Sequence, residues 1–282
     1  MAGRYHVRSI SLPSRSHPTT LRLEEELNKL KTCSASTSES ICKGLAGLDE
    51  LYKCMDDLLN MSSAQQVLSQ NRHEKYVEEL LDGSVRLLDI CGITRDTILQ
   101  IKEHVRALQS ALRRRSKGDS SIESNINSYT IFKKKMKKDA KKLITSLKQM
   151  ENKWGALPAL DLDHHLGAVI RVIREVCVMN VSIFQSLLLF LTAPVSKTKP
   201  TGWSLVSKLM HKGAVACEEK QEIVNEMEAV DASLRTLSRF ASSSHKSLED
   251  LESSMEKMEN GLECLFRRLI KTRASLLNII SQ

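Results

Sequence analysis

Two groups of residues have types and spacing that suit recognition of charged partners. The first lies in Arg8-Ser9-Ile10-Ser11-Leu12-Pro13, which matches the R-S-x-S-x-P pattern that 14-3-3 adaptor proteins bind when the second serine is phosphorylated. Phosphoserine carries a charge of about −2 and three acceptor oxygens, which suit a cluster of arginines. Arg8, Ser11 and Pro13 are therefore a candidate phospho-docking motif, with 14-3-3 as a partner if Ser11 is phosphorylated.

The second group is a basic run between residues 113 and 148, where twelve bases stand against three acids. The rest of the chain is close to neutral, so the formal net charge of +8 is local. On a helical projection the lysines lie away from the apolar stripe of this segment, and Lys133 is the nearest to the stripe. The candidate anionic-surface residues are Arg113, Arg114, Arg115, Lys133, Lys134, Lys135, Lys137, Lys138, Lys141 and Lys142.

Three interpretations of the basic run stay open. A solvated face that keeps the protein soluble is the simplest, and an acidic membrane surface or acidic protein is the second. Nucleic acid is disfavoured, because proteins that bind single-stranded nucleic acid usually place aromatic residues among their lysines and arginines. Here Tyr129, Phe132 and Trp154 lie on the apolar stripe instead.

Signals of catalysis or metal binding are weak. Gly44-x-x-Gly47 is too short for a phosphate-binding loop, and the sequence has neither H-E-x-x-H nor C-x-x-C. A tight group of possible metal ligands comprises Asp161, Asp163, His164 and His165. Adjacent helical histidines point about 100° apart, so a helix cap is the better account. We expect no enzymatic activity, cofactor or metal.

The cysteines and the N-terminus indicate the compartment. The 7 cysteines are dispersed, which is typical of reduced thiols in a cytosol-like compartment. Residues 1–23 contain arginines and hydroxyl residues but no acid, which also fits a plastid or mitochondrial transit peptide. We favour a disordered basic tail over residues 1–19 and a cytoplasmic protein, with peripheral membrane attachment as an option.

The composition and the apolar spacing predict the fold. Only 5 prolines, 11 glycines and 4% aromatic residues argue against sheets, which need turns and aromatic residues. We expect an all-α, elongated bundle in a single domain over residues 20–282, with loops near 116–121, 155–161 and 194–202. Predicted helix starts include a capping box at Ser36-x-x-Glu39 and a second start at Ser62-x-x-Gln65. A helix from Tyr76 to about Arg115 contains Gly83 and Gly92, which can bend it.

An uncharged stretch extends from Val176 to Ser196. It is long enough to span a membrane, but Asn180 and Gln185 would then need partners in lipid. We favour a central core helix over residues 163–193, covered by its neighbours.

A heptad pattern runs through residues 223–279, with steps of three and four that continue in phase past Ser244. We favour one long helix, packed along the uncharged helix, over two helices joined by a turn at 242–245. This coiled-coil-like helix could pair with a partner or fold back within the chain, so the oligomeric state stays open.

Several blocks of the sequence are similar to a plant-specific family of helical proteins of unknown biochemistry, the BYPASS-like proteins. The blocks are residues 8–18, 80–89, 108–114, 203–209 and 265–270. The resemblance implies an all-helical plant protein associated with root and shoot development, and it brings no catalytic residue or cofactor. The expected function is a non-enzymatic interaction or scaffold protein. The alternative is a membrane-associated protein that acts in trafficking or in transport of a developmental signal.

Overall fold

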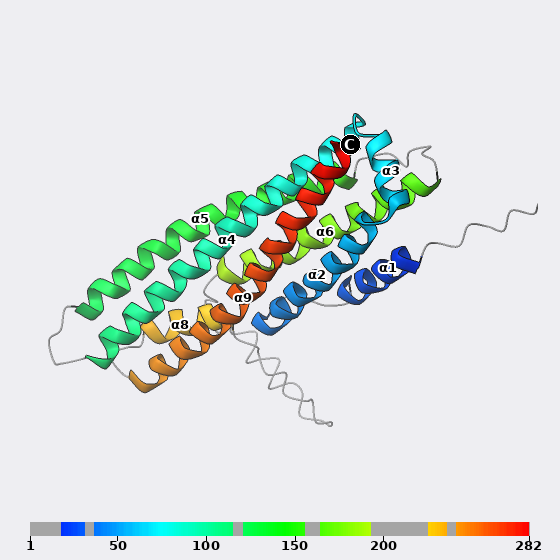
Figure 1. The fold of residues 1–282 in the computed structure, drawn as a ribbon. Coiled ribbons are helices and arrows are strands. Elements are labelled where there is room, and N and C mark those ends of the chain that lie inside the picture. Colours follow the sequence, from blue (N-terminus) through cyan, green and yellow to red (C-terminus); the bar gives the residue numbers. More distant parts are fainter. Residues whose placement is uncertain are drawn as a thin grey trace, which may run out of the picture.

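The computed structural model describes residues 18–31, 37–114, 121–155, 164–192, 225–235 and 241–281. Within these ranges the regular structure is entirely α-helical, which confirms the all-α prediction (Figure 1). The helices are α1 (Pro18–Lys31), α2 (Ser38–Leu59), α3 (Ser62–Gln70), α4 (Lys75–Arg113), α5 (Ser121–Gly155), α6 (His164–Thr192), α8 (Glu226–Arg235) and α9 (Ala241–Ile280).

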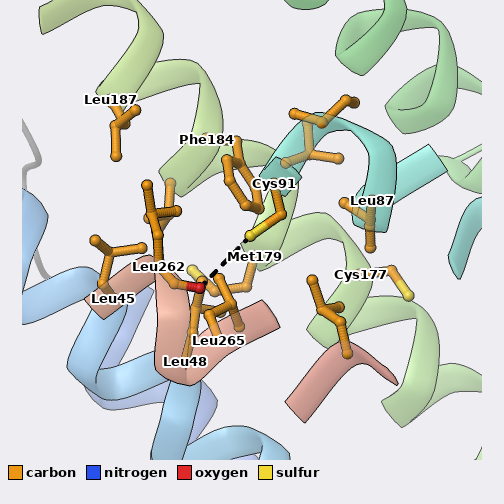
Figure 2. Packing of buried hydrophobic residues seen from close by; sticks show 14 of the residues in the cluster. Leu45, Leu48, Leu87, Cys91, Cys177, Met179, Phe184, Leu187, Leu262 and Leu265 are labelled. Atoms are coloured by element: carbon orange, nitrogen blue, oxygen red, sulfur yellow. Dashed lines mark hydrogen bonds between the residues drawn. The ribbon is translucent and has the colours of Figure 1, made fainter. Parts of the chain in front are cut away.

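The long helices lie side by side in an elongated bundle, with α9 between α2 and α4 (Figure 1). Helix α1 packs on α2 and α6, and α5 packs on α4 and α6. Side chains of α2, α4, α6 and α9 meet in the core, where Leu45, Cys91, Phe184 and Leu262 lie together (Figure 2). Each of these helices therefore buries one face in a shared interior.

Ion pairs across the core helices define their directions. Helices α4 and α9 are antiparallel, because residues that rise along α4 pair with residues that fall along α9. The pairs are Arg95–Glu263 at 2.6 Å, Lys102–Glu259 at 2.5 Å and Arg106–Glu252 at 2.7 Å. On the other flank of α9, Arg268 binds Asp49 of α2 at 2.8 Å.

The heptad pattern is resolved into two helices, so the prediction of one long helix is wrong. Helix α8 ends at Arg235, α9 begins at Ala241, and the two helices pack against each other. The hydroxyl of Ser244 donates to the carbonyl of Ser233 at 3.3 Å, and that of Ser254 donates to the Glu226 carboxylate at 2.9 Å. The spacing of apolar residues reports only which face of each helix is buried. It therefore does not show whether the chain continues as one helix or turns back as two.

The stripe of α9 is buried as predicted. Within the described part of the chain, α9 packs on α4, α2 and α8. The buried positions are Leu248, Leu251, Met255, Met258, Leu262, Leu265, Leu269, Thr272, Leu276 and Ile279. Contrary to our expectation, α9 packs most closely along α4 and α2 rather than along α6, although side chains of α6 and α9 do meet in the core.

Helix α6 is largely buried. Gly167–Thr192 is long and apolar enough to cross a membrane, the one such span in the described part of the chain, and 61% of its most apolar window is buried. Asn180 is fully buried, and its side-chain amide donates to the Tyr52 hydroxyl at 3.0 Å and to the Val176 carbonyl at 2.8 Å. The partner that this amide needs is therefore supplied by α2.

Several predicted boundaries shift by a few residues. Helix α2 is capped by a box of Thr37 and Ser40, not by Ser36 and Glu39. The Ser40 amide donates to Thr37 Oγ1 at 3.1 Å, and the Thr37 amide donates to Ser40 Oγ at 2.9 Å. Pro18 begins α1, inside the predicted tail; Ser121 begins α5 and Gly155 ends it, inside the predicted loops.

Candidate functional site

The basic run falls largely on α5, an amphipathic helix. Its predicted stripe packs inward, with Tyr129, Leu147 and Trp154 buried. The lysines on the opposite side are exposed, and we name this set the outer face of α5: Lys135, Lys138, Lys141, Lys142 and Lys148. Lys142 binds Asp139 at 3.2 Å, and the structure gives the other four no ion pair with a described residue. The helical spacing in the sequence therefore predicted correctly which side of α5 is exposed.

The arginines at the end of α4 do not join the lysines of α5. The rings of His104 and Phe132 pack with their centroids 4.6 Å apart, which sets the level of α4 against α5. Arg113 and Arg114 are exposed. Arg113 lies nine residues after His104, which is about 13 Å further along α4 at the helical rise of about 1.5 Å per residue. The candidate anionic patch is thus split in two, and Arg115 lies outside the described residues.

Lys133 does not belong to an exposed patch, so its assignment to the anionic surface is wrong. It is buried, and its ammonium forms an ion pair with the Asp231 carboxylate of α8. Burial lowers the pKa of Lys133, and the neighbouring Asp231 carboxylate partly offsets this effect. The position of Lys133 near the apolar stripe was already an indication of burial in the sequence. Its partner, Asp231 of α8, could not be identified from the sequence.

A groove of about 300 Å³ lies between α5 and α8, and we name it the α5–α8 groove. Tyr129 lines it beside Asp231, and burial together with this carboxylate raises the pKa of the phenol. The groove is lined by Ile126, Tyr129, Thr130, Lys133, Lys134, Lys137, Asp231, Leu234 and Arg235. Because it requires α8 to be a separate helix, the groove could not be predicted from the heptad pattern.

The charges in the α5–α8 groove are unbalanced. Asp231 is its one carboxylate, and Lys133 already occupies it. Lys134, Lys137 and Arg235 also line the groove, and none of them forms an ion pair with a described residue. Three cations therefore surround the hollow without a matching acid among the residues that line it.

A second hollow of about 210 Å³ lies among α4, α5 and α6. It is lined by apolar side chains such as Phe132 and Leu188, and by Lys135, Asp96 and Asp139. Its charges are mixed, so it favours neither an anion nor a cation.

The described cysteines are free. Cys54, Cys91 and Cys177 are buried, while Cys264 is exposed. The Cys91 thiol donates to the Leu262 carbonyl at 3.7 Å (Figure 2). Burial raises the pKa of Cys91 and of Cys177 to about 12, so both stay protonated at neutral pH.

The group of possible metal ligands, which we interpreted as a helix cap, and the phospho-docking motif fall mostly outside the described residues. Among the residues that the structure describes, no three His, Cys, Asp or Glu side chains come together as metal ligands. His164 begins α6 and His165 follows it, whereas Asp161 and Asp163 lie outside the described ranges. Arg8, Ser11 and Pro13 lie outside them as well.

Comparison with known proteins points to a family. A protein-family model described as Protein BPS1 matches residues 44–279, which extend from within α2 almost to the end of α9. No match was found among curated proteins or among solved structures.

Proposed function

The chain belongs to the BPS1 protein family, as its BYPASS-like sequence blocks predicted, and on this basis we propose that it acts in plant root and shoot development as a non-enzymatic scaffold. In this role it contacts acidic protein partners through the outer face of α5. The observation that carries the proposal is the concentration of lysines on a helix whose apolar side is already buried.

The packing of the bundle supports contact through charge. The stripe of α9 is covered by α2 and α4, so it offers a partner no free seam. The outer face of α5 leaves several lysines accessible, with Asp139 as the one acid paired to them among the described residues. Complementary charge mainly speeds and selects association, which suits a scaffold with exchangeable partners.

We assign the protein no reaction. The family brings no catalytic residue with it, and the α5–α8 groove is lined by neither cysteine nor histidine. The buried thiols of Cys91 and Cys177 are protonated at neutral pH, which disfavours them as nucleophiles.

Proximity labelling in plant cells tests the scaffold proposal. The full-length protein is compared with an outer-face variant that carries Lys138→Gln, Lys141→Gln and Lys148→Gln. We expect acidic proteins to be enriched by the unchanged protein and at least fivefold less by the variant. Equal enrichment by both would reject the outer face as the contact surface. A result no different from the free labelling enzyme would reject the scaffold function itself.

Attachment to a membrane, in trafficking or in transport of a developmental signal, is the second candidate function. It is favoured by the length and apolarity of Gly167–Thr192 and by the lysines of α5, since each basic residue near an anionic bilayer contributes about 1 kcal/mol. Retention in the pellet after alkaline carbonate extraction would support a span. Flotation with anionic but not neutral liposomes would support peripheral attachment, and failure of both would reject this function.

A further inference from the structure

We propose that the α5–α8 groove binds a small, multiply phosphorylated anion. The inference rests on cations that converge from two helices on one hollow, and it is independent of the scaffold proposal. The groove has a volume of about 300 Å³, which is at the lower end for small-molecule sites.

The cations come from both walls. Lys134 and Lys137 are three residues apart on α5, so their side chains lie on the same edge of that helix. Arg235 is the last residue of α8 and lines the same hollow from that helix. A guanidinium can bind two oxygens of one phosphate, while the ammonium groups act as point charges on others. Several phosphates on one ligand would use all three cations.

The buried Lys133–Asp231 pair holds the two walls together. This ion pair joins the middle of α5 to α8, and both side chains are almost fully buried. The pair also removes Asp231 as a repulsive charge, because this carboxylate is neutralised before an anion arrives. Glu228 of α8 lies near enough to act on Lys133, so it is the remaining acidic influence on the groove.

The other lining groups fit a ligand with a carbon skeleton. Ile126 and Leu234 provide apolar contacts. The Thr130 hydroxyl donates to the Ile126 carbonyl at 2.8 Å, so its proton is not available to a phosphate. Recognition of the phosphates therefore falls to Lys134, Lys137 and Arg235.

Calorimetric titration of the full-length protein tests the site, with inositol 1,4,5-trisphosphate and inorganic phosphate as probes. We expect the trisphosphate to bind and inorganic phosphate to bind at least tenfold more weakly. The groove variant combines Lys134→Gln, Lys137→Gln and Arg235→Gln. The outer-face variant serves as its matched control, since it removes the same number of charges and adds the same side chains.

We expect the groove variant to bind the trisphosphate at least tenfold more weakly and the control to change by less than twofold. Equal weakening in both variants would mean nonspecific attraction and would overturn the proposal, as would absence of binding to the unchanged protein. Helicity and the melting temperature are measured for each variant. If the triple variant unfolds, the exposed single change Lys134→Glu replaces it, with Lys138→Glu as control, and the same contrast is required.

Vesicles that contain phosphatidylinositol 4,5-bisphosphate identify the source of the ligand. Flotation that depends on the groove residues would assign a lipid headgroup, and trisphosphate binding without flotation would assign a soluble phosphate. The scaffold proposal is tested by loss of partners from the outer-face variant, so either proposal can fail while the other stands.

Discussion

Gly83 of α4 lies directly against Trp154 of α5. A Cβ added to Gly83 would be 2.4 Å from Cζ2 of Trp154, far closer than van der Waals contact. The glycine therefore allows the indole of α5 to approach the backbone of α4, and it does so inside a continuous helix. The second glycine of α4, Gly92, has no neighbouring atom within 4 Å of such a Cβ.

We expect Gly83→Ala and Gly92→Ala to have opposite effects on stability. Alanine favours a helix by about 1 kcal/mol over glycine, so Gly92→Ala should raise the free energy of unfolding by up to that amount. At Gly83 the clash should outweigh this gain and lower the free energy of unfolding by about 1–3 kcal/mol. Urea denaturation measures both, and a stabilised Gly83→Ala protein would contradict the close packing.

Removing one charge of the Lys133–Asp231 pair should lower the free energy of unfolding more than removing both charges. Asp231→Asn leaves a buried ammonium without its carboxylate, and we expect a loss of about 3 kcal/mol in the free energy of unfolding. The double change Lys133→Met with Asp231→Asn should recover most of that loss, because neither charge remains buried. The interaction energy from this double-mutant cycle is the measurement, and simple additivity would contradict it.

The same pair gives a pH dependence. Burial lowers the pKa of Lys133 in the folded protein below its value of 10.5 in the unfolded chain. The unfolded state then binds more protons between these two values, so the contribution of Lys133 to stability rises with pH across this window. The rise should be larger in Asp231→Asn, where the carboxylate no longer supports the charged form. The difference in unfolding free energy between the unchanged protein and Asp231→Asn is measured over this pH range. A difference that does not change with pH would contradict the prediction.

Sequence periodicity located the faces of the helices but not their partners. The stripes of α5 and α9 were readable because helical burial repeats every three or four residues. Two facts could not follow from it: the division of the heptad segment into α8 and α9, which leaves the phase intact, and the position of α9 beside α2 and α4. The α5–α8 groove depends on the first fact. Gly83 and Gly92 looked equivalent because only the neighbouring helix distinguishes them.

Truncation of the α9 stripe should destabilise the monomer itself. Leu262 is fully buried, so Leu262→Ala should lower the free energy of unfolding by about 2–5 kcal/mol. Leu277 is 43% exposed on the same helix, and Leu277→Ala should change it by less than about 1 kcal/mol. Because the stripe is covered within the chain, light scattering should give a monomeric mass; a dimer that Leu262→Ala dissociates would contradict this.

Thiol labelling should separate the described cysteines. Cys264 is exposed, whereas Cys91 and Cys177 are buried with pKa values raised to about 12. At pH 8 we expect a maleimide to modify Cys264 in the native protein, and the two buried thiols at least a thousandfold more slowly. Peptide-resolved mass spectrometry follows each site, and denaturation should abolish the difference. Rapid native labelling of Cys91 would contradict the core packing.

Phosphorylation of Ser11 should create a binding site for 14-3-3 proteins. A peptide of residues 4–18 that carries phosphoserine at Ser11 should retain 14-3-3 in a pull-down, because the phosphate pairs with the arginines of the adaptor groove. The unphosphorylated peptide and a peptide phosphorylated at Ser9 are the controls. Failure of the Ser11 phosphopeptide to retain 14-3-3 would remove this partner.

The position of α9 between α2 and α4 has a consequence for biosynthesis. Helix α9 leaves the ribosome after all the other described helices, yet it covers apolar faces on α2 and α4 that were made much earlier. Those faces must wait uncovered while the intervening chain is synthesised, and contacts so distant in sequence form slowly. A nascent chain arrested before α9 should therefore be a good chaperone client, and completion of α9 should release it.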